Sequence, residues 1–322
     1  GRTTTRRDGQ LSRQHYSSFH RHPPPGDVSR ARPAPSIRRR RRVQTSYVDQ
    51  GDGSPIVLIH GGDPGRGSTG ASIWHRNIPG LARTHRVVAP DRLGIGWTDN
   101  PACIDDYRMS RICAHVERFL DVVEVSGATV VGQSRGAFVA AHLARVRPDL
   151  VDRLVVVNSA SFAPKRAAKR KVTIQNFQGL PETVEDDERW LSVGHGHITA
   201  AWVAEARAML STDKATRARR QFAEAAEAYY AEMETLKSDL LDWYRAGNGH
   251  QSRLIVWGVG DPSVGIQDGL DSFEVLRRSE ATTRMYVIDR AGHHCFAEQP
   301  EEFNRQVLDF IRHDRATVRS RR

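Results

Sequence analysis

Apolar and polar positions follow two alternating patterns along the chain from residue 43 onward. Short apolar runs, rich in β-branched residues and mostly ended by turn residues, predict strands at 43–47, 55–60, 86–90, 128–132, 153–157, 253–258 and 284–289. Longer segments with helical periodicity lie at 107–123, 137–146, 272–279 and 300–313. This alternation predicts an α/β fold with a mainly parallel sheet that helices cover on both faces.

One long region departs from the alternation. Residues 161–250 contain no run that predicts a buried strand, but helical patterns extend over 198–210 and 215–244. We expect a helical lid above the carboxyl ends of the strands, where open parallel sheets bind ligands. The predicted organisation is a leader at 1–42, a core in two parts at 43–160 and 251–314, the lid at 161–250, and a tail at 315–322.

The positive charge of the chain is concentrated at its two ends. Residues 1–42 contain twelve arginines and two aspartates, a surplus equal to the net charge of +10 of the whole chain. The tail at 315–322 adds four arginines and no acid, which leaves the core and lid mildly acidic. A folded surface that binds nucleic acid needs clustered basic residues, so we expect no specific nucleic-acid partner.

The leader is rich in arginine and proline and poor in residues that could form a core, so we expect it to be disordered. We favour a segment added or read through upstream; a transit peptide and a polybasic segment for nucleic acid or anionic membrane are alternatives. No apolar stretch reaches the ~18 residues of a membrane span, so we expect a cytoplasmic protein. Three scattered cysteines are too few for a disulfide framework or a zinc cluster.

A serine stands between two glycines where the run at 128–132 ends. The sequence Gly132-Gln133-Ser134-Arg135-Gly136 follows a predicted strand and precedes a predicted helix. In this context a sharp turn exposes the serine hydroxyl, and glycines avoid the crowding that side chains would cause. The pattern is short enough to occur by chance, so a simple turn is the alternative to a nucleophile.

A second glycine-containing turn, His60-Gly61-Gly62, follows the run at 55–60. Acyl transfer places negative charge on the former carbonyl oxygen, and two fixed backbone N–H groups can stabilise it. We expect these two donors at Gly62 and Arg135. We expect His60 to brace the loop rather than to take part in the chemistry.

An acid and a base follow the last two predicted strands. Asp261 comes after the sixth run and can orient a histidine, although an ordinary Asp-Pro turn is the alternative. His293 follows a glycine after the seventh run and is our candidate general base, with His294 as its rival. The chain order Ser134, Asp261, His293 is the order expected of hydrolases with this architecture.

Other polar residues receive different interpretations. The rival position for the acid, after the fifth run, holds Asn158, which cannot carry charge. His195 and His197 lie in the predicted lid and are interpreted as surface or insertion residues.

Further stretches at 60–65, 74–77, 89–96 and 292–293, with 300–304, complete a pattern that extends over residues 43–314. With these motifs the chain resembles the α/β-hydrolases, and more narrowly the meta-cleavage product hydrolases. Members of that narrower family hydrolyse a carbon–carbon bond in 2-hydroxy-6-oxo-dienoates, which are ring-fission products of aromatic breakdown, without a cofactor. The resemblance implies a small-molecule substrate with a carboxylate, and it allows a homodimer.

The resemblance also implies a mechanism. The histidine helps to convert the dienol into a ketone, and Ser134, or a water activated there, attacks the C6 carbonyl. The oxyanion forms against Gly62 and Arg135, and carbon then leaves as a stabilised carbanion.

The chain departs from the family pattern where the pocket is expected. Asp63 replaces a small residue, Gln133 replaces an asparagine, and His294 replaces an aromatic residue, so all three are candidate substrate contacts. The family often holds the substrate carboxylate with a lid arginine, which makes Arg207 a candidate; an exposed helix face is the alternative. Arg135 either holds an anionic substrate group or pairs with a carboxylate such as Asp63.

Three functions remain open at this stage. The first is a carbon–carbon hydrolase, the second an esterase or lactonase with the same triad, and the third a non-catalytic member that binds a small ligand. The sequence contains no Walker loop, no HExxH and no CxxC, so we expect no nucleotide, metal or redox cofactor.

Overall fold

A computed structural model of the chain describes residues 43–65, 69–163 and 179–320, with side chains as far as residue 313. The leader at 1–42, and with it the expectation of disorder, lies outside these residues. Among the described helices, none combines the length and the apolar character that crossing a bilayer requires.

Seven strands of the described chain form one sheet in the order β1-β3-β2-β4-β5-β6-β7. Their bounds are β1 Tyr47–Gln50, β2 Pro55–Ile59, β3 Arg86–Pro90, β4 Ala128–Gln133, β5 Val151–Val157, β6 Ser252–Gly258 and β7 Thr283–Ile288. β1 is antiparallel to β3, and the other neighbouring pairs are parallel. The mainly parallel sheet is confirmed, and the turns after its parallel strands meet at one edge.

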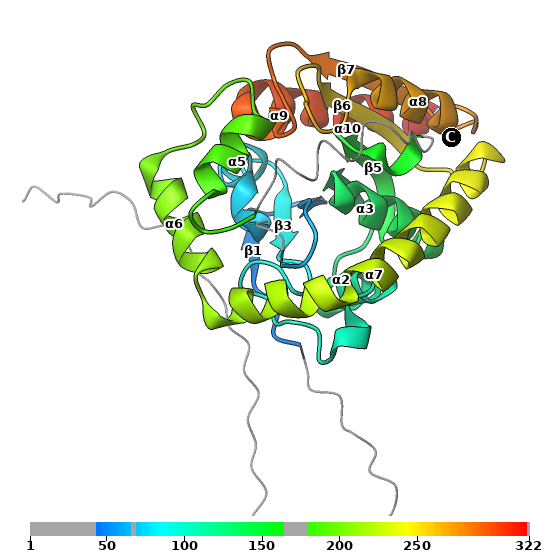
Figure 1. The fold of residues 1–322 in the computed structure, drawn as a ribbon. Coiled ribbons are helices and arrows are strands. Elements are labelled where there is room, and N and C mark those ends of the chain that lie inside the picture. The colour runs from blue at the N-terminus through cyan, green and yellow to red at the C-terminus, as the bar shows by residue number, and fades with distance from the viewer. Residues whose placement is uncertain (1–42, 66–68, 164–178, 321–322) are drawn as a thin grey trace, which may run out of the picture.

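Alternate residues along each strand point to opposite faces of the sheet, and each face has its own apolar core. Val57 and Ile59 pack in one cluster with α2 and α3, whereas Ile56 and Leu58 pack in the other with α1 and α10. Helices therefore cover both faces, as predicted (Figure 1). The core helices are η1 Gly70–Trp74, α1 Ile78–Leu81, η2 Ile104–Asp106, α2 Met109–Val122, α3 Arg135–Val146, η3 Ala160–Phe162, α8 Ile266–Leu276, α9 Cys295–Glu298 and α10 Pro300–Ser320.

The described part of the predicted lid, from residue 179, contains helices and no strand. These are α5 Val184–Leu191, α6 Ala200–Leu210 and α7 Asp213–Arg245, which arc around the sheet in Figure 1. Thr199 and Thr212 cap α6 and α7 by accepting hydrogen bonds from N–H groups three residues on, at 3.2 and 3.1 Å. Trp202 of α6 packs in the apolar core on one face of the sheet, and Tyr229 of α7 packs in the core on the other face. The lid is therefore packed against the rest of the fold.

The bounds of several elements differ from the predicted ones for local reasons. The first strand begins at Tyr47, because the backbone of Gln44 instead exchanges hydrogen bonds with Asp99, at 2.8 and 3.0 Å. The final helix continues to Ser320, so most of the predicted tail extends it. Helix α8 lies at Ile266–Leu276, earlier than the predicted 272–279.

Candidate active site

Ser134 lies at a sharp turn between β4 and α3. Its φ of 50° is in the left-handed region, which is uncommon for a residue with a side chain. The chain passes close to itself here: a Cβ on Gly132 would lie 2.4 Å from the oxygen of Gly136, and one on Gly136 would lie 2.2 Å from that of Ile59. Glycine is therefore required at both positions, and the strained turn presents Ser134 to a cavity.

Hydrogen bonds from the neighbouring strand hold the turn in place. The N–H of Ser134 donates to the oxygen of Val157 at 2.9 Å. The hydroxyl of Ser159 donates to the oxygen of Ser134 at 2.7 Å. The turn is fixed on both sides of the serine, so the position of its hydroxyl is set by the sheet.

Asp261, after β6, and His293, after β7, form a buried pair. Nδ1 of His293 lies 2.7 Å from Oδ2 of Asp261. A proton on Nδ1 donated to this oxygen leaves Nε2 with a lone pair, as a general base requires. Asp261 pairs with His293 and not with its rival His294, which contacts Glu188.

The pair shifts the pKa values of both partners. Burial lowers the pKa of His293, but the charge of Asp261 and its hydrogen bond outweigh burial and raise the pKa above its usual value. Burial raises the pKa of Asp261, but His293 and the donors around the carboxylate outweigh it and lower the pKa. Asp261 is therefore ionised at neutral pH, and it favours the protonated form of the imidazole.

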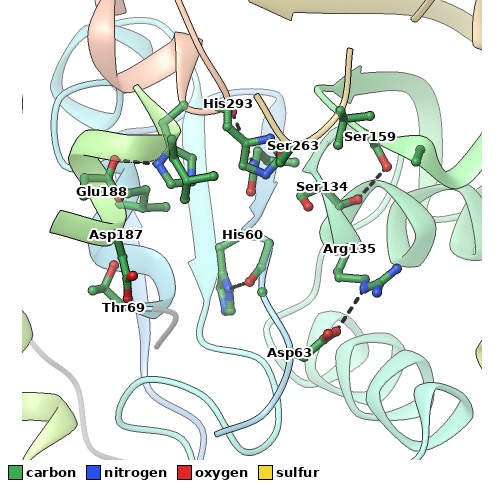
Figure 2. A pocket seen from close by; sticks show the side chains of 18 of the residues that line it. His60, Asp63, Thr69, Ser134, Arg135, Ser159, Asp187, Glu188, Ser263 and His293 are labelled. Carbon is green, nitrogen blue, oxygen red and sulfur yellow. Dashed lines mark hydrogen bonds and ion pairs between the residues drawn. The ribbon is translucent and has the colours of Figure 1, made fainter. Parts of the chain in front are cut away.

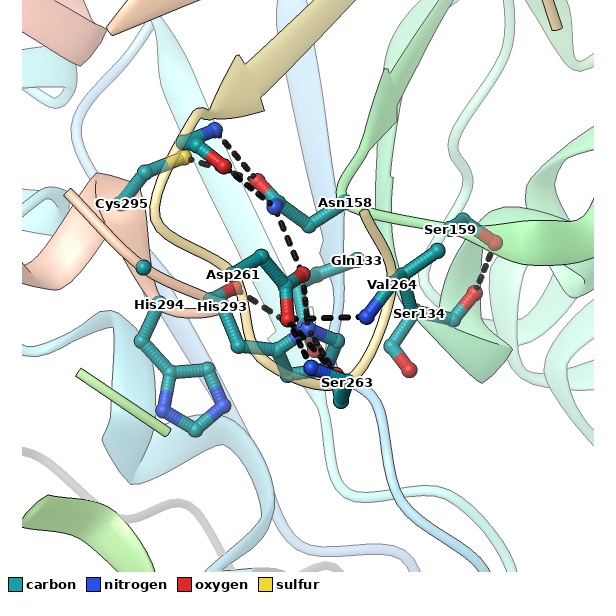
Figure 3. Close-up of polar contacts among 12 residues, drawn as sticks. Gln133, Ser134, Asn158, Ser159, Asp261, Ser263, Val264, His293, His294 and Cys295 are labelled. Atoms are coloured by element: carbon teal, nitrogen blue, oxygen red, sulfur yellow. Dashed lines mark hydrogen bonds and ion pairs between the residues drawn. The ribbon is translucent and has the colours of Figure 1, made fainter. Parts of the chain in front are cut away.

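Ser134 and His293 line one cavity and lie side by side in Figures 2 and 3. Among the described residues, no hydrogen bond joins the hydroxyl of Ser134 to the imidazole. Such contacts are often loose in hydrolases without substrate and tighten in the complex. The structure thus brings the three predicted residues to one place, with the acid–base contact formed.

Two residues that the sequence analysis did not assign to the site hold the carboxylate of Asp261. Asn158 donates from Nδ2 to Oδ2 at 2.8 Å and accepts at Oδ1 from the N–H of Gly258 at 3.0 Å. Ser263 donates to Oδ1 from its N–H at 2.7 Å and from its hydroxyl at 2.8 Å. The rival acid position after β5 therefore contributes a donor that orients the acid.

Two buried side chains, those of His60 and Arg92, brace the loop after β2. Nε2 of His60 accepts from the N–H of Arg92 at 3.0 Å, so its proton is on Nδ1, which donates to the oxygen of Gly61 at 2.8 Å. Arg92 also donates to the oxygens of Gly61 and Gly62, at 2.7 and 2.5 Å. The bracing role expected of His60 is confirmed, and Arg92 is a partner that the sequence analysis missed.

These contacts decide where the backbone donors of the loop point. In a trans peptide the carbonyl of Gly61 and the N–H of Gly62 point in opposite directions. His60 and Arg92 hold the carbonyl, which leaves the N–H of Gly62 on the other side. The N–H of Arg135 lies in the first turn of α3, where N–H groups have no acceptor within the helix.

Arg135 pairs with Asp63, as one of its two interpretations expected. Nε of Arg135 lies 3.0 Å from Oδ1 of Asp63, and the hydroxyls of Tyr229 and Tyr230 each donate to the same carboxylate at 2.9 Å. Burial raises the pKa of Asp63, but Arg135 and these hydroxyls outweigh it and lower the pKa. Asp63 thus offsets the cation at the start of α3 (Figure 2). Through Tyr229 and Tyr230 it also joins the lid helix α7 to the loop after β2.

The other candidate substrate contacts have different positions. Gln133 and His294 line the cavity with Asp63. Arg207 is not among the lining residues; its side chain is 49% exposed and lies 3.7 Å from Glu185. The exposed-face interpretation of Arg207 therefore holds, because α6 turns this residue toward solvent. His197, interpreted as a surface or insertion residue, lies in the insertion between α5 and α6 and is buried, at 1% exposure.

The cavity has a volume of about 290 Å³ and lies between the core and the lid. Core residues on one side include Ser134 and His293, and lid residues on the other include Trp202 and Lys237. A cavity of this size suits a small organic substrate. Lys237 carried no signal in the sequence, because only the packing of α7 shows which of its lysines faces inward.

Comparisons with known proteins agree with the observed fold. Residues 54–300 match the model of the alpha/beta hydrolase fold family. A 2-hydroxy-6-oxo-6-(2'-aminophenyl)hexa-2,4-dienoic acid hydrolase of Metapseudomonas resinovorans is 28% identical over 84% of this chain and 88% of its own. A 2-hydroxy-6-oxo-2,4-heptadienoate hydrolase of Pseudomonas putida is 28% identical over 84% of this chain and 93% of its own.

A solved structure of a meta-cleavage product hydrolase from Pseudomonas fluorescens is similar in fold. It superposes with a TM-score of 0.70 at 24% identity, covering 84% of this chain and 95% of that chain.

Proposed function

This chain belongs to the alpha/beta hydrolase fold family, and on that premise we propose that it hydrolyses the carbon–carbon bond of a 2-hydroxy-6-oxo-dienoate with Ser134, Asp261 and His293. The observation that carries the proposal is the 2.7 Å contact between Asp261 and His293, with His293 lining the same cavity as Ser134. The class of substrate comes from relatives that match most of the chain and are named for such dienoates.

His293 moves protons in two steps of the proposed reaction. It first transfers the proton of the 2-hydroxyl group to C5, which converts the dienol into a ketone. Nε2 then takes a proton from the hydroxyl of Ser134, or from a water there, and the oxygen attacks the C6 carbonyl. Asp261 stabilises the imidazolium that forms.

The negative charge that develops on the C6 oxygen is stabilised by the N–H groups of Gly62 and Arg135. In serine hydrolases one such donor contributes about 2.7–4 kcal/mol to the transition state. The C5–C6 bond then breaks, and its electron pair stays with C5, where conjugation to the 2-oxo group stabilises it. When Ser134 is the attacking group, C6 is left as an ester of Ser134, and a water deprotonated by His293 hydrolyses this ester and regenerates the serine. One water is consumed overall: its hydroxyl ends on C6 as a carboxylic acid, and a proton ends on the 2-hydroxy-dienoate.

The test is a comparison of two substrate classes on the same protein. We expect loss of the visible absorbance of a 2-hydroxy-6-oxo-6-aryl-dienoate, with release of the aryl carboxylic acid, and much slower release of nitrophenol from simple esters. Turnover of esters alone would replace the proposal by an esterase or lactonase with the same triad. Binding of the dienoate without turnover of either class would replace it by a ligand-binding role, and Ser134→Ala provides the background rate.

A further inference from the structure

A second group of polar side chains lies beside the catalytic residues and takes no part in the reaction proposed above. Glu188 comes from α5, His197 from the loop between α5 and α6, and His294 from the segment that carries His293. One ligand atom of each residue lies within 4.8 Å of those of the other two. Glu188 and His294 also line the cavity.

Both imidazole rings point at one carboxylate oxygen. Nε2 of His197 lies 2.7 Å from Oε1 of Glu188, and Nδ1 of His294 lies 2.5 Å from the same atom. The hydroxyl of Ser192 is 3.3 Å from Nε2 of His197. The ring centroids of His293 and His294 are 5.2 Å apart, but each ring contacts a different carboxylate, Asp261 for His293 and Glu188 for His294 (Figure 3).

The three side chains are largely withdrawn from solvent. Glu188 and His197 are 5% and 1% exposed, and the side chain of His294 is 12% exposed. His294 stands where the meta-cleavage product hydrolases often have an aromatic residue, which would not supply an imidazole ligand. The group is therefore a property of this chain rather than of the family pattern.

Two imidazoles and one carboxylate form a ligand set that proteins use for divalent transition metals. Zinc enzymes bind their ion with two histidines and a glutamate and leave a fourth position open, and non-haem iron uses a similar set. We propose that Glu188, His197 and His294 bind one divalent transition-metal ion, with Zn²⁺ as the best-matched probe. Because Glu188 and His294 line the cavity, an ion held by these residues would lie next to it.

Such an ion would connect the lid to the core. Glu188 and His197 belong to the lid, whereas His294 follows β7 directly beside the general base. Because the ion binds the folded arrangement and not the unfolded chain, it raises the thermal stability of the protein. Metal binding thus has a readout that does not depend on catalysis or on the proposed function.

One feature of the site limits its affinity. When Nε2 of His197 binds a metal, the ring proton moves to Nδ1, which is buried and has no hydrogen-bond partner among the described residues. We therefore expect a dissociation constant in the micromolar range for Zn²⁺ rather than the nanomolar range.

The experiment titrates chelator-treated full-length protein with Zn²⁺ by calorimetry and with Co²⁺ by visible absorption. We expect one ion per chain, intense d–d bands of low-coordinate Co²⁺, and a rise in Tm of about 5 °C at saturating Zn²⁺. His294→Asn and Glu188→Gln should each weaken binding by more than about 100-fold.

His195→Asn is the matched control. His195 lies on the same lid loop, is exposed, and is not one of the three ligands, so binding should be unchanged. His20 and His22 of the leader are present in every variant, so any binding there cancels in the comparison. Absence of saturable binding by the parent protein overturns the proposal, and so does equal binding by the parent and both ligand variants.

Discussion

His293 depends on its neighbours for both its orientation and its pKa. The imidazole is buried, which lowers its pKa, and is paired with Asp261, which raises the pKa by more. In the proposed reaction His293 is the general base and must be unprotonated to act, so we expect activity to appear only as the pH rises through this raised pKa.

We therefore expect the acid limb of kcat/KM to have an apparent pKa above 6.5, the ordinary value for histidine. Replacing Asp261 by asparagine removes the opposing charge and leaves the burial, so the pKa of His293 should fall. The histidine C–H resonances in a pH titration by NMR report this directly, even where Asp261→Asn is too slow to assay. An acid limb below 6.5 in the parent protein would contradict this account of the pair.

Only some residues of the candidate site could be predicted from the sequence. Ser134, Asp261 and His293 were predictable because each follows a strand within a recognisable turn. The roles of Asn158 and Arg92 were not predictable. Asn158 is 103 residues from its partner Asp261, and Arg92 is 31 residues from its partner Gly61, and no sequence motif indicates either contact. The same holds for Glu188, whose two histidine partners come from different parts of the chain.

At the scale of elements, the turn from β4 into α3 depends on two close backbone approaches. A Cβ atom on Gly136 would lie only 2.2 Å from the backbone oxygen of Ile59 on β2. Backbone cannot move aside as a flexible side chain can, so β2 and α3 would have to separate.

We expect Gly136→Ala to lower the free energy of unfolding by about 1–3 kcal/mol and to reduce activity through displacement of Arg135 and Ser134. Gly265→Ala is the matched control, because its Cβ would meet nothing within 4 Å. Urea unfolding and kcat/KM measured on both variants check this. Equal, small effects of the two substitutions would mean that the approach of β2 to α3 is not a constraint.

The elements of the core were predicted more closely than those of the lid. Apolar runs that are buried on both faces identify a strand without knowledge of its partners, and β2 to β6 are strands of this kind. The edge strands β1 and β7 are only partly buried. The lid helices carry polar and apolar residues on several faces. Their periodicity therefore predicted that helices form there, but not which of their residues face the cavity. Arg207 was for that reason a candidate that the structure places outside the cavity, and Lys237 was overlooked.

At the scale of the whole molecule, the sheet and the lid enclose the cavity in which we propose that the reaction takes place. In the proposed mechanism, the turns that follow the strands supply the serine, the acid, the base and both oxyanion donors. The lid supplies the opposite wall and contacts the core through Asp63, which accepts from Tyr229 and Tyr230 at 2.9 Å. We therefore expect core residues to carry out the reaction and lid residues to determine which substrates fit the cavity.

The most direct test of the central claim is the rate of dienoate cleavage with and without the Ser134 hydroxyl. A 2-hydroxy-6-oxo-6-aryl-dienoate is followed by loss of its absorbance and by chromatography of the acid product, in the parent protein and in Ser134→Ala. We predict stoichiometric acid from the parent and a kcat/KM at least about 10³-fold lower in the variant. A variant that cleaves the dienoate within a few-fold of the parent rate would contradict the account.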